Sequence, residues 1–162
     1  MRSRSRNSEQ HVSEVMTRNP ECVTERDSIR NVAKLMLDND AGSIPVVEEN
    51  GRKVIGIITD RDIVVRLVAA GRDMDSARVS EAMTRGAKTV RQDQSVDSVY
   101  DIMSREQIRR VPVVDHNDEI VGIVAVKDLA LEDDDKHDLA QTVEQISEGP
   151  GSNQGRGTTQ AR

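Results

Sequence analysis

The sequence predicts a mixed α/β (α+β) fold in which two pseudo-symmetric β-α-β-β-α repeats pack as one module. The first observation is a duplication: VSEVMTR at residues 12–18 recurs as VSEAMTR at residues 79–85, an offset of 67 residues. Aligned without gaps from residues 12–47 onto 79–114, the copies are identical at 13 of 36 positions. The other two observations, present in each copy, are an apolar stripe with helical period and a pair of short β-branched runs joined by a turn.

Each repeat is expected to begin with a short strand, around Cys22-Val23-Thr24 or Thr89-Val90, followed by an amphipathic helix. Asp27-Ser28 and Gln94-Ser95 offer side chains that can cap the first turn of these helices. The apolar stripes follow positions i, i+3, i+4, i+7 and i+8 and are expected to face the core. They comprise Ile29, Val32, Ala33, Met36 and Leu37 in the first repeat, and Val96, Val99, Tyr100 and Met103 in the second.

A β-hairpin and a second helix complete each repeat. IPVV and VIGII flank Asn50-Gly51, and VPVV and IVGIV flank His116-Asn117-Asp118. Asn and Gly can supply the positive φ that tight turns need, so both segments are predicted to be hairpins. One repeat alone is too small to bury its apolar faces, and we therefore expect the two repeats to share one globule.

Four segments follow from this organisation: a disordered tail at residues 1–10, repeats at 11–71 and 76–132, and a C-terminal segment at 133–162. The acidic linker EDDDKHD, residues 132–138, leads into the C-terminal segment, and Leu139, Val143 and Ile146 then follow at the spacing of a short helix. Its last residues are rich in Gly, Ser, Thr and Gln, which predicts a disordered tail.

Composition excludes several classes of protein. The net charge of −6 and the low aromatic content of 1% disfavour a broad nucleic-acid surface, leaving only Arg2, Arg4 and Arg6 of the tail as a weak alternative. No apolar run approaches the roughly 20 residues that span a bilayer, and the single cysteine cannot form an internal disulfide. We therefore expect a cytoplasmic protein without a membrane partner.

The stretch GIITDRDIV at residues 56–64 carries the first candidate site. A Thr59 hydroxyl beside the free N–H groups of a helix start suits a phosphate, and the Asp62 carboxylate one turn later suits ribose hydroxyls. The same Thr-x-x-Asp spacing is also that of a capping box, in which each side chain bonds the other's backbone N–H. Spacing alone leaves both interpretations open.

The second repeat tests these alternatives, because Ala125 stands where the first repeat has Thr59 while the carboxylate is kept as Asp128. If capping were the only purpose, Asp128 would lack a partner, so its presence favours a ribose role. Arg109 and Arg110 precede Val111-Pro112, and their guanidinium groups could bind phosphate in place of the missing hydroxyl. An acid-paired surface is the alternative for both arginines.

In order and duplication, these residues resemble the cystathionine beta-synthase (CBS) domain family, whose domains occur as tandem pairs called Bateman modules. The resemblance covers residues 12–131 and is closest to stand-alone bacterial CBS-pair proteins of the stress or hypoxic-response type. The residues that carry it are Gly42-Ser43-Ile44-Pro45-Val46-Val47-Glu48, Ile55-Gly56-Ile57-Ile58-Thr59 and Asp62 in the first repeat, and Val111-Pro112-Val113-Val114-Asp115, Val121-Gly122-Ile123-Val124 and Asp128 in the second.

The resemblance implies a regulatory module that binds adenosine-containing ligands between the two repeats: AMP, ADP or ATP first, S-adenosylmethionine or NAD(H) less commonly. It also implies a disc-shaped homodimer. Gly42 would allow close backbone approach, while Ile44 and Val111 would either sandwich the adenine or belong to the core. The candidate ligand-binding residues are Thr59, Asp62, Gly42, Ile44, Pro45, Arg109, Arg110, Val111, Pro112 and Asp128.

We expect a binding protein rather than an enzyme, since no Ser-His-Asp, Cys-His or P-loop pattern accompanies the carboxylates. His11, His116 and His137 do not share zinc-ligand spacing, so no metal site is predicted. Asp60 and Arg61 have no matching pair in the second repeat and are interpreted as surface or helix-start residues. The alternative function is a ligand-free dimerising scaffold that holds an unidentified protein partner.

Overall fold

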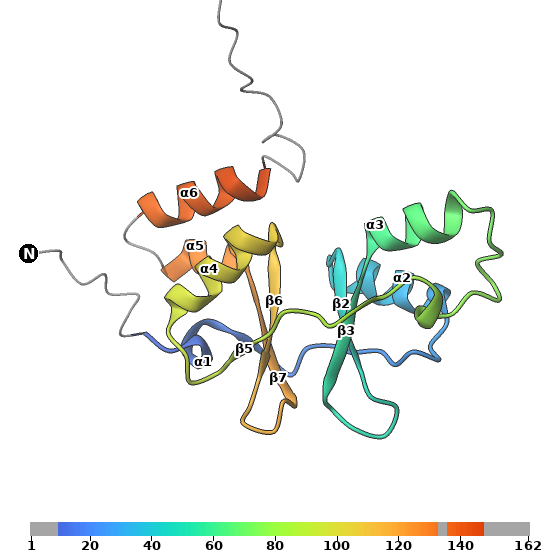
Figure 1. The fold of residues 1–162 in the computed structure, drawn as a ribbon, viewed down its shortest axis with the longest axis horizontal. Helices are drawn as coiled ribbons and strands as arrows, with labels where there is room; N and C mark the ends of the chain where they lie inside the picture. The colour runs from blue at the N-terminus through green and yellow to red at the C-terminus, as the bar shows by residue number, and fades with distance from the viewer. Residues whose placement is uncertain (1–9, 133–135, 148–162) are drawn as a thin grey trace, which may run out of the picture.

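The protein consists of two halves, each built on its own β-sheet, as Figure 1 shows. The computed structural model describes residues 10–132 and 136–147. The first half holds a three-stranded sheet in the order β2 (Ser43–Val47), β3 (Val54–Thr59) and β4 (Thr84–Arg85). The second half holds a four-stranded sheet in the order β1 (Thr17–Arg18), β7 (Ile120–Ala125), β6 (Arg110–Val114) and β5 (Val90–Arg91). The predicted fold class is confirmed.

The long helix of each repeat lies where the apolar stripes predict it. Helix α2 (Ile29–Asp38) begins at Ser28, whose hydroxyl accepts a hydrogen bond from the Asn31 backbone at 3.1 Å. Helix α4 (Val96–Glu106) begins after Ser95, which makes no such side-chain bond. The stripe of α4 is buried as expected, but that of α2 is only partly so: Ala33 and Leu37 are exposed.

Both predicted hairpins are present, and their strands pair in the same register. β2 pairs antiparallel with β3, and β6 with β7, each with an irregularity before its last valine, Val47 or Val114. The expected positive φ occurs at Asp118 in the second turn, whereas neither Asn50 nor Gly51 has one, so that detail of the first turn is wrong. The turn ends of the two hairpins meet across the halves, where the backbones of Lys53 and Glu119 form an isolated antiparallel β-bridge.

The duplicated VSE-x-MTR segments are exchanged between the halves. Residues 12–18 form α1 (Val12–Val15) and β1, which pack on α4 and pair with β7 of the second half. Residues 79–85 form the 3₁₀ turn η3 (Val79–Glu81) and β4, which pack in the first half and pair with β3. The packing units therefore differ from the sequence repeats by this exchange, and each half depends on a segment of the other repeat.

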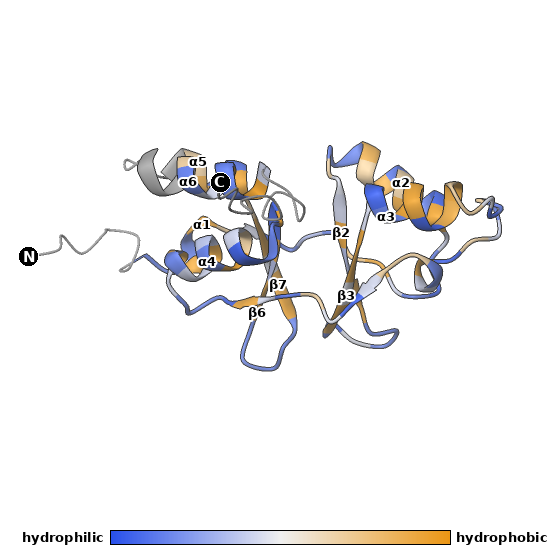
Figure 2. Cartoon of the chain, turned by 45° about the horizontal axis from the view of Figure 1, so that its top comes forward, coloured by the Kyte–Doolittle hydropathy of each residue, from blue (hydrophilic) through white to orange (hydrophobic). Residues whose placement is uncertain are grey.

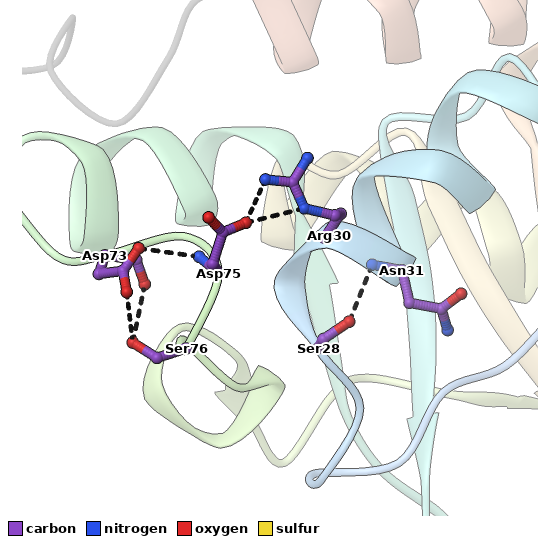
Figure 3. A network of polar contacts seen from close by, with 6 residues as sticks. All are labelled: Ser28, Arg30, Asn31, Asp73, Asp75 and Ser76. Atoms are coloured by element: carbon purple, nitrogen blue, oxygen red, sulfur yellow. Dashed lines mark hydrogen bonds and ion pairs between the residues drawn. The ribbon is translucent and has the colours of Figure 1, made fainter.

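The connection between the repeats is anchored to the first half. After α3 (Asp60–Ile63) and the π-helical turn η2 (Val64–Val68), the chain reaches Asp75, which accepts a hydrogen bond from Arg30 of α2 at 2.9 Å (Figure 3). Asp73 holds the same loop through Ser76 and the Asp75 backbone. Arg30 and Asp75 are both exposed, so solvent screens this ion pair and it adds little to stability.

Two helices follow the second sheet. Helix α5 (Val126–Glu132) is the counterpart of α3, and α6 (Lys136–Ser147), in the segment predicted to hold a short helix, packs over α4 and α5. The tails at 1–9 and 148–162 and linker residues 133–135 lie outside the described residues. Across the described ranges, no helix has both the length and the apolar character that crossing a bilayer requires.

Candidate functional site

A cleft of about 1150 Å³ opens between the two halves. Its first wall combines the start of β2 with the end of β3 and the start of α3. Its second wall combines the end of α4 with the start of β6 and the β7–α5 junction. The lining residues are Gly42, Ser43, Ile57, Thr59, Asp60, Arg61 and Thr84 from the first half, Gly86, Ala87 and Lys88 from the segment between β4 and β5, and Glu106, Gln107, Ile108, Arg109, Arg110, Pro112, Ala125, Val126, Lys127, Val143, Ile146 and Ser147 from the second half and α6.

The cleft is basic although the protein is acidic. Five lining side chains are cationic and two are anionic, a formal charge of +3 against −6 for the whole chain. Such a concentration of one sign in a concave site attracts ligands of the opposite sign. The cations are Arg61, Lys88, Arg109, Arg110 and Lys127, and the anions are Asp60 and Glu106.

Thr59 and Asp62 form a complete capping box at the start of α3. The Asp62 backbone donates to Thr59 Oγ1 at 3.0 Å, and the Thr59 backbone donates to Asp62 Oδ2 at 3.0 Å. The Thr59 hydroxyl accepts in this pair, so its proton remains available for an acceptor in the cleft that Thr59 lines. Capping and a phosphate contact are therefore compatible at Thr59.

Asp128 repeats half of this box. Its Oδ2 accepts a hydrogen bond from the Ala125 backbone at 2.8 Å. The expectation that Asp128 would lack a partner without a ribose is therefore wrong, because a carboxylate at this position caps the helix start without a hydroxyl opposite it. The retention of Asp128 does not by itself support a ribose role.

Ser43, which lines the cleft, carries an unsatisfied polar group. Its hydroxyl oxygen is buried and has no hydrogen-bond partner within residues 10–132 and 136–147. A buried hydroxyl normally finds a partner, and leaving it unpaired costs about 1–3 kcal/mol. Gly42 next to it is closely approached, since a Cβ atom there would lie 3.2 Å from Asp60 Oδ2. The first wall thus combines hydroxyl groups with accessible backbone.

Arg109 and Arg110 are the counterparts of Gly42 and Ser43 in the second wall. The Arg109 carbonyl accepts from the Val126 backbone at 3.0 Å, just as the Gly42 carbonyl accepts from Asp60. Among the described residues neither guanidinium has an ion-pair or hydrogen-bond partner, unlike Arg30, Arg66 and Arg85. Within residues 10–132 and 136–147, no contact pairs either arginine with an acid.

The structure brings half of the predicted residues to the cleft. Thr59, Gly42, Arg109, Arg110 and Pro112 line it. Ile44, Pro45 and Val111 are buried in the two halves, and the Asp62 and Asp128 carboxylates lie beside the cleft on helix N-termini.

Several lining residues were missed by sequence reasoning. Asp60 and Arg61 do stand at a helix start, as interpreted, but both also line the cleft. Lys127 is the counterpart of Arg61, so the repeat itself could have identified it. Lys88 has no such signal in the sequence.

The fold and cleft define a tandem-repeat module with a ligand-sized, cation-lined space between its halves. The family model for the CBS domain matches residues 12–69 and 79–134, so the chain belongs to the CBS domain family. The protein YlbB of Bacillus subtilis is 35% identical over 144 residues, covering 89% of this chain and 96% of YlbB. Hypoxic response protein 1 of Mycobacterium tuberculosis is 32% identical over 117 residues, covering 72% and 80%.

Two kinds of ligand occur in similar solved structures. The CBS domain pair of protein MJ0100, in complex with 5′-methylthioadenosine and S-adenosylmethionine, is 32% identical, with a TM-score of 0.66 and coverage of 76% of this chain and 98% of that one. Hypoxic Response Protein I was solved with two coordinated zinc ions; it is 31% identical, with a TM-score of 0.68 and coverage of 75% and 98%. Where side chains are described here, no group of three or more His, Cys, Asp or Glu could hold a metal ion.

Proposed function

We propose that this protein is a regulatory module that binds an adenine nucleotide, AMP, ADP or ATP, in the cleft between its halves. The observation that carries the proposal is the excess of cationic side chains in this cleft of an acidic protein. The guanidinium groups of Arg109 and Arg110, which have no partner among the described residues, suit phosphate, and the Ser43 and Thr59 hydroxyls would supply hydrogen bonds from the opposite wall.

The charge of the cleft also ranks the ligands. The similar CBS pair of MJ0100 holds S-adenosylmethionine and 5′-methylthioadenosine, which share the adenosine moiety with the nucleotides. S-adenosylmethionine carries a cationic sulfonium and methylthioadenosine carries no charge, so neither gains from five nearby cations as a phosphate does. We expect ATP and ADP to bind more tightly than AMP, and S-adenosylmethionine to bind more weakly than all three. NAD(H) carries two phosphate charges, so it gains less from the cations than ADP or ATP.

We propose that the module binds its ligand without a chemical step and acts in the cytoplasm. No His or Cys is among the described residues that line the cleft, so no imidazole or thiol is placed to act on a ligand. Burial raises the pKa of the Cys22 thiol to about 11, which keeps the thiol protonated and poorly nucleophilic near neutral pH. Regulation would follow from different affinities for two arrangements of the dimer.

Calorimetric and thermal titration with AMP, ADP, ATP, S-adenosylmethionine and NADH tests this function. In the wild type we expect ATP to raise the melting temperature, because a ligand that binds only the folded state stabilises it. Asp62→Ala is expected to abolish most of this shift if its carboxylate holds ribose. Asp128→Ala removes the equivalent backbone hydrogen bond in the half that lacks the Thr hydroxyl, and it should retain most of the shift.

Both variants lose a helix cap, so each should lose about 1 kcal/mol of unfolding free energy without ligand. If both variants lose the same stability and ATP still raises their melting temperatures as it does in the wild type, Asp62 caps the helix and does not hold ribose. A wild type that binds none of the five compounds would contradict nucleotide sensing and favour the ligand-free scaffold.

We further propose that the protein is a homodimer that pairs through α2 and η2. Leu37 is 80% exposed, and three valines of η2 are each more than half exposed, which is unusually apolar for residues in contact with solvent. Figure 2 shows hydrophobic residues along α2 and α3 in this half. In the second half the position equivalent to Leu37 is Ser104, which lies under α6 with its hydroxyl 3.4 Å from that of Thr142. The chain thus covers one of two equivalent faces itself. The η2 residues are Val64, Val65 and Val68.

Leu37→Asp is expected to weaken the dimer at least about 30-fold, because a charge would be buried in the centre of an apolar contact. Asn31→Asp adds the same charge to an exposed position of α2 and should leave the dimer intact. Sedimentation equilibrium across a concentration series measures both. A wild type that remains monomeric, or a Leu37→Asp variant that associates as tightly, would contradict this interface.

A further inference from the structure

Helix α6 follows the matched CBS domains, which end at residue 134, and is docked on the second half. The Thr142 side chain is 4% exposed and faces Ser104 of α4. The Gln107 side chain donates to the Gln145 carbonyl at 3.3 Å, and Ile146 packs against the second-half core. These contacts place the last turns of α6 over the end of α4.

One face of the docked helix also belongs to the cleft. Val143, Ile146 and Ser147 stand at positions i, i+3 and i+4, and all three line the space between the halves. Val143 is 42% exposed, although its neighbour Thr142 in the same helix is buried. An apolar side chain left half-exposed in a ligand-sized cleft is a surface that an apolar part of a ligand would cover.

Gln107 connects this helix to the cationic wall. It ends α4 in the left-handed conformation, with φ 54°, and it lines the cleft together with Arg109 two residues later. The residue that holds the backbone of α6 is therefore part of the turn that positions Arg109 and Arg110. A shift of this turn would affect the arginine wall and the docking of α6 together.

We infer that α6 forms a third wall of the ligand site and that its docking is coupled to occupancy of the cleft. Val143 and Ile146 provide an apolar surface for the base of a nucleotide, while the arginines take the phosphates. Because coupling is reciprocal, undocking α6 lowers the affinity for the ligand by the same factor by which the bound ligand favours the docked helix. This inference rests on the proposed function, and it makes α6 the element through which the protein reports the ligand.

Two variants of the full chain test the coupling with ATP, or with whichever of the five compounds binds the wild type most tightly. Val143→Ser removes the apolar side chain without adding charge and is expected to weaken binding about five- to tenfold. Thr142→Asp places a charge under α6, undocks the helix and should weaken binding at least as much. Gln141→Ser changes an exposed α6 position that does not line the cleft, and it should bind within twofold of the wild type.

Hydrogen exchange at Ala140–Ser147 gives a readout that does not depend on affinity. Saturating ATP should slow exchange of these α6 amides several-fold in the wild type, and Thr142→Asp should exchange rapidly without ligand. If the wild type binds while both variants bind equally well and α6 exchange is unchanged by ATP, the inference is overturned and the proposed function stands. If the wild type binds none of the five compounds, the proposed function fails first and the inference fails with it.

Discussion

Replacing both Arg109 and Arg110 with alanine is expected to weaken ATP binding by about 100-fold, because each guanidinium loses charge-assisted hydrogen bonds to phosphate. Neither side chain has a partner among the described residues, so their removal leaves no buried carboxylate unpaired. The backbone bond from Val126 to the Arg109 carbonyl does not involve the side chain and remains. Isothermal titration with ATP, AMP and adenosine at one salt concentration measures the effect.

The three ligands separate a phosphate contact from general damage to the cleft. AMP should lose less affinity than ATP, and adenosine should change by less than about threefold, because it carries no phosphate. Arg30→Ala removes an arginine that does not line the cleft and is paired on the surface with Asp75, so it should bind ATP like the wild type. Equal losses for all three ligands would show that the arginines shape the cleft rather than hold phosphate.

The local elements of the fold could be predicted from the sequence because they depend on short-range periodicity. The hairpins, α2 and α4 lie where alternating and helical patterns predict them. The exchange of residues 12–18 and 79–85 could not be predicted in this way. Val12 and Val79 are both fully buried, and near-identical segments show the same apolar pattern whether they pack in their own half or in the other. The duplication that revealed the fold therefore also concealed the exchange.

The prediction that the whole apolar stripe of α2 faces the core is wrong at Leu37 for a related reason. Helical periodicity shows that Leu37 belongs to an apolar face, but not whether the same chain covers that face. The counterpart Ser104 is covered by α6, a helix outside the repeat, while Leu37 is left exposed. Apolar periodicity at Leu37 thus agrees with an interface as well as with a core.

The candidate site was only partly predictable because its walls come from distant segments. Thr59 and the two arginines were found from motif and spacing, and all three line the cleft. Lys88 comes from the segment between β4 and β5, and Val143 comes from α6; neither belongs to a repeated motif. The spacing of Thr59 and Asp62 fits a cap and a ligand grip equally, since both need a hydroxyl and a carboxylate one turn apart. Only the structure shows which hydrogen bonds Thr59 and Asp62 make.

Gly56→Ala is expected to lower the free energy of unfolding by about 3 kcal/mol, because the exchanged strand β4 lies directly on this residue. A Cβ atom at Gly56 would lie 2.4 Å from both the Thr84 carbonyl oxygen and Met83 Cε. The methionine could move, but the carbonyl belongs to the strand that pairs with β3. Urea denaturation at one protein concentration measures this loss of unfolding free energy as a lower midpoint concentration with an unchanged m-value.

Gly122 and Gly51 provide a graded comparison. At Gly122, in the equivalent place of the second half, a Cβ atom would lie 2.4 Å from Met16 Sδ but 3.0 Å from the Thr17 carbonyl. The flexible methionine can yield, so Gly122→Ala should cost less, about 1–2 kcal/mol. At Gly51 the nearest atom is the flexible Glu48 carboxylate at 3.3 Å, and Gly51→Ala should stay within about 0.5 kcal/mol of the wild type. Because Gly56 and Gly122 each contact a segment from the other repeat, this order of losses follows from the exchange; equal stability of all three variants would contradict it.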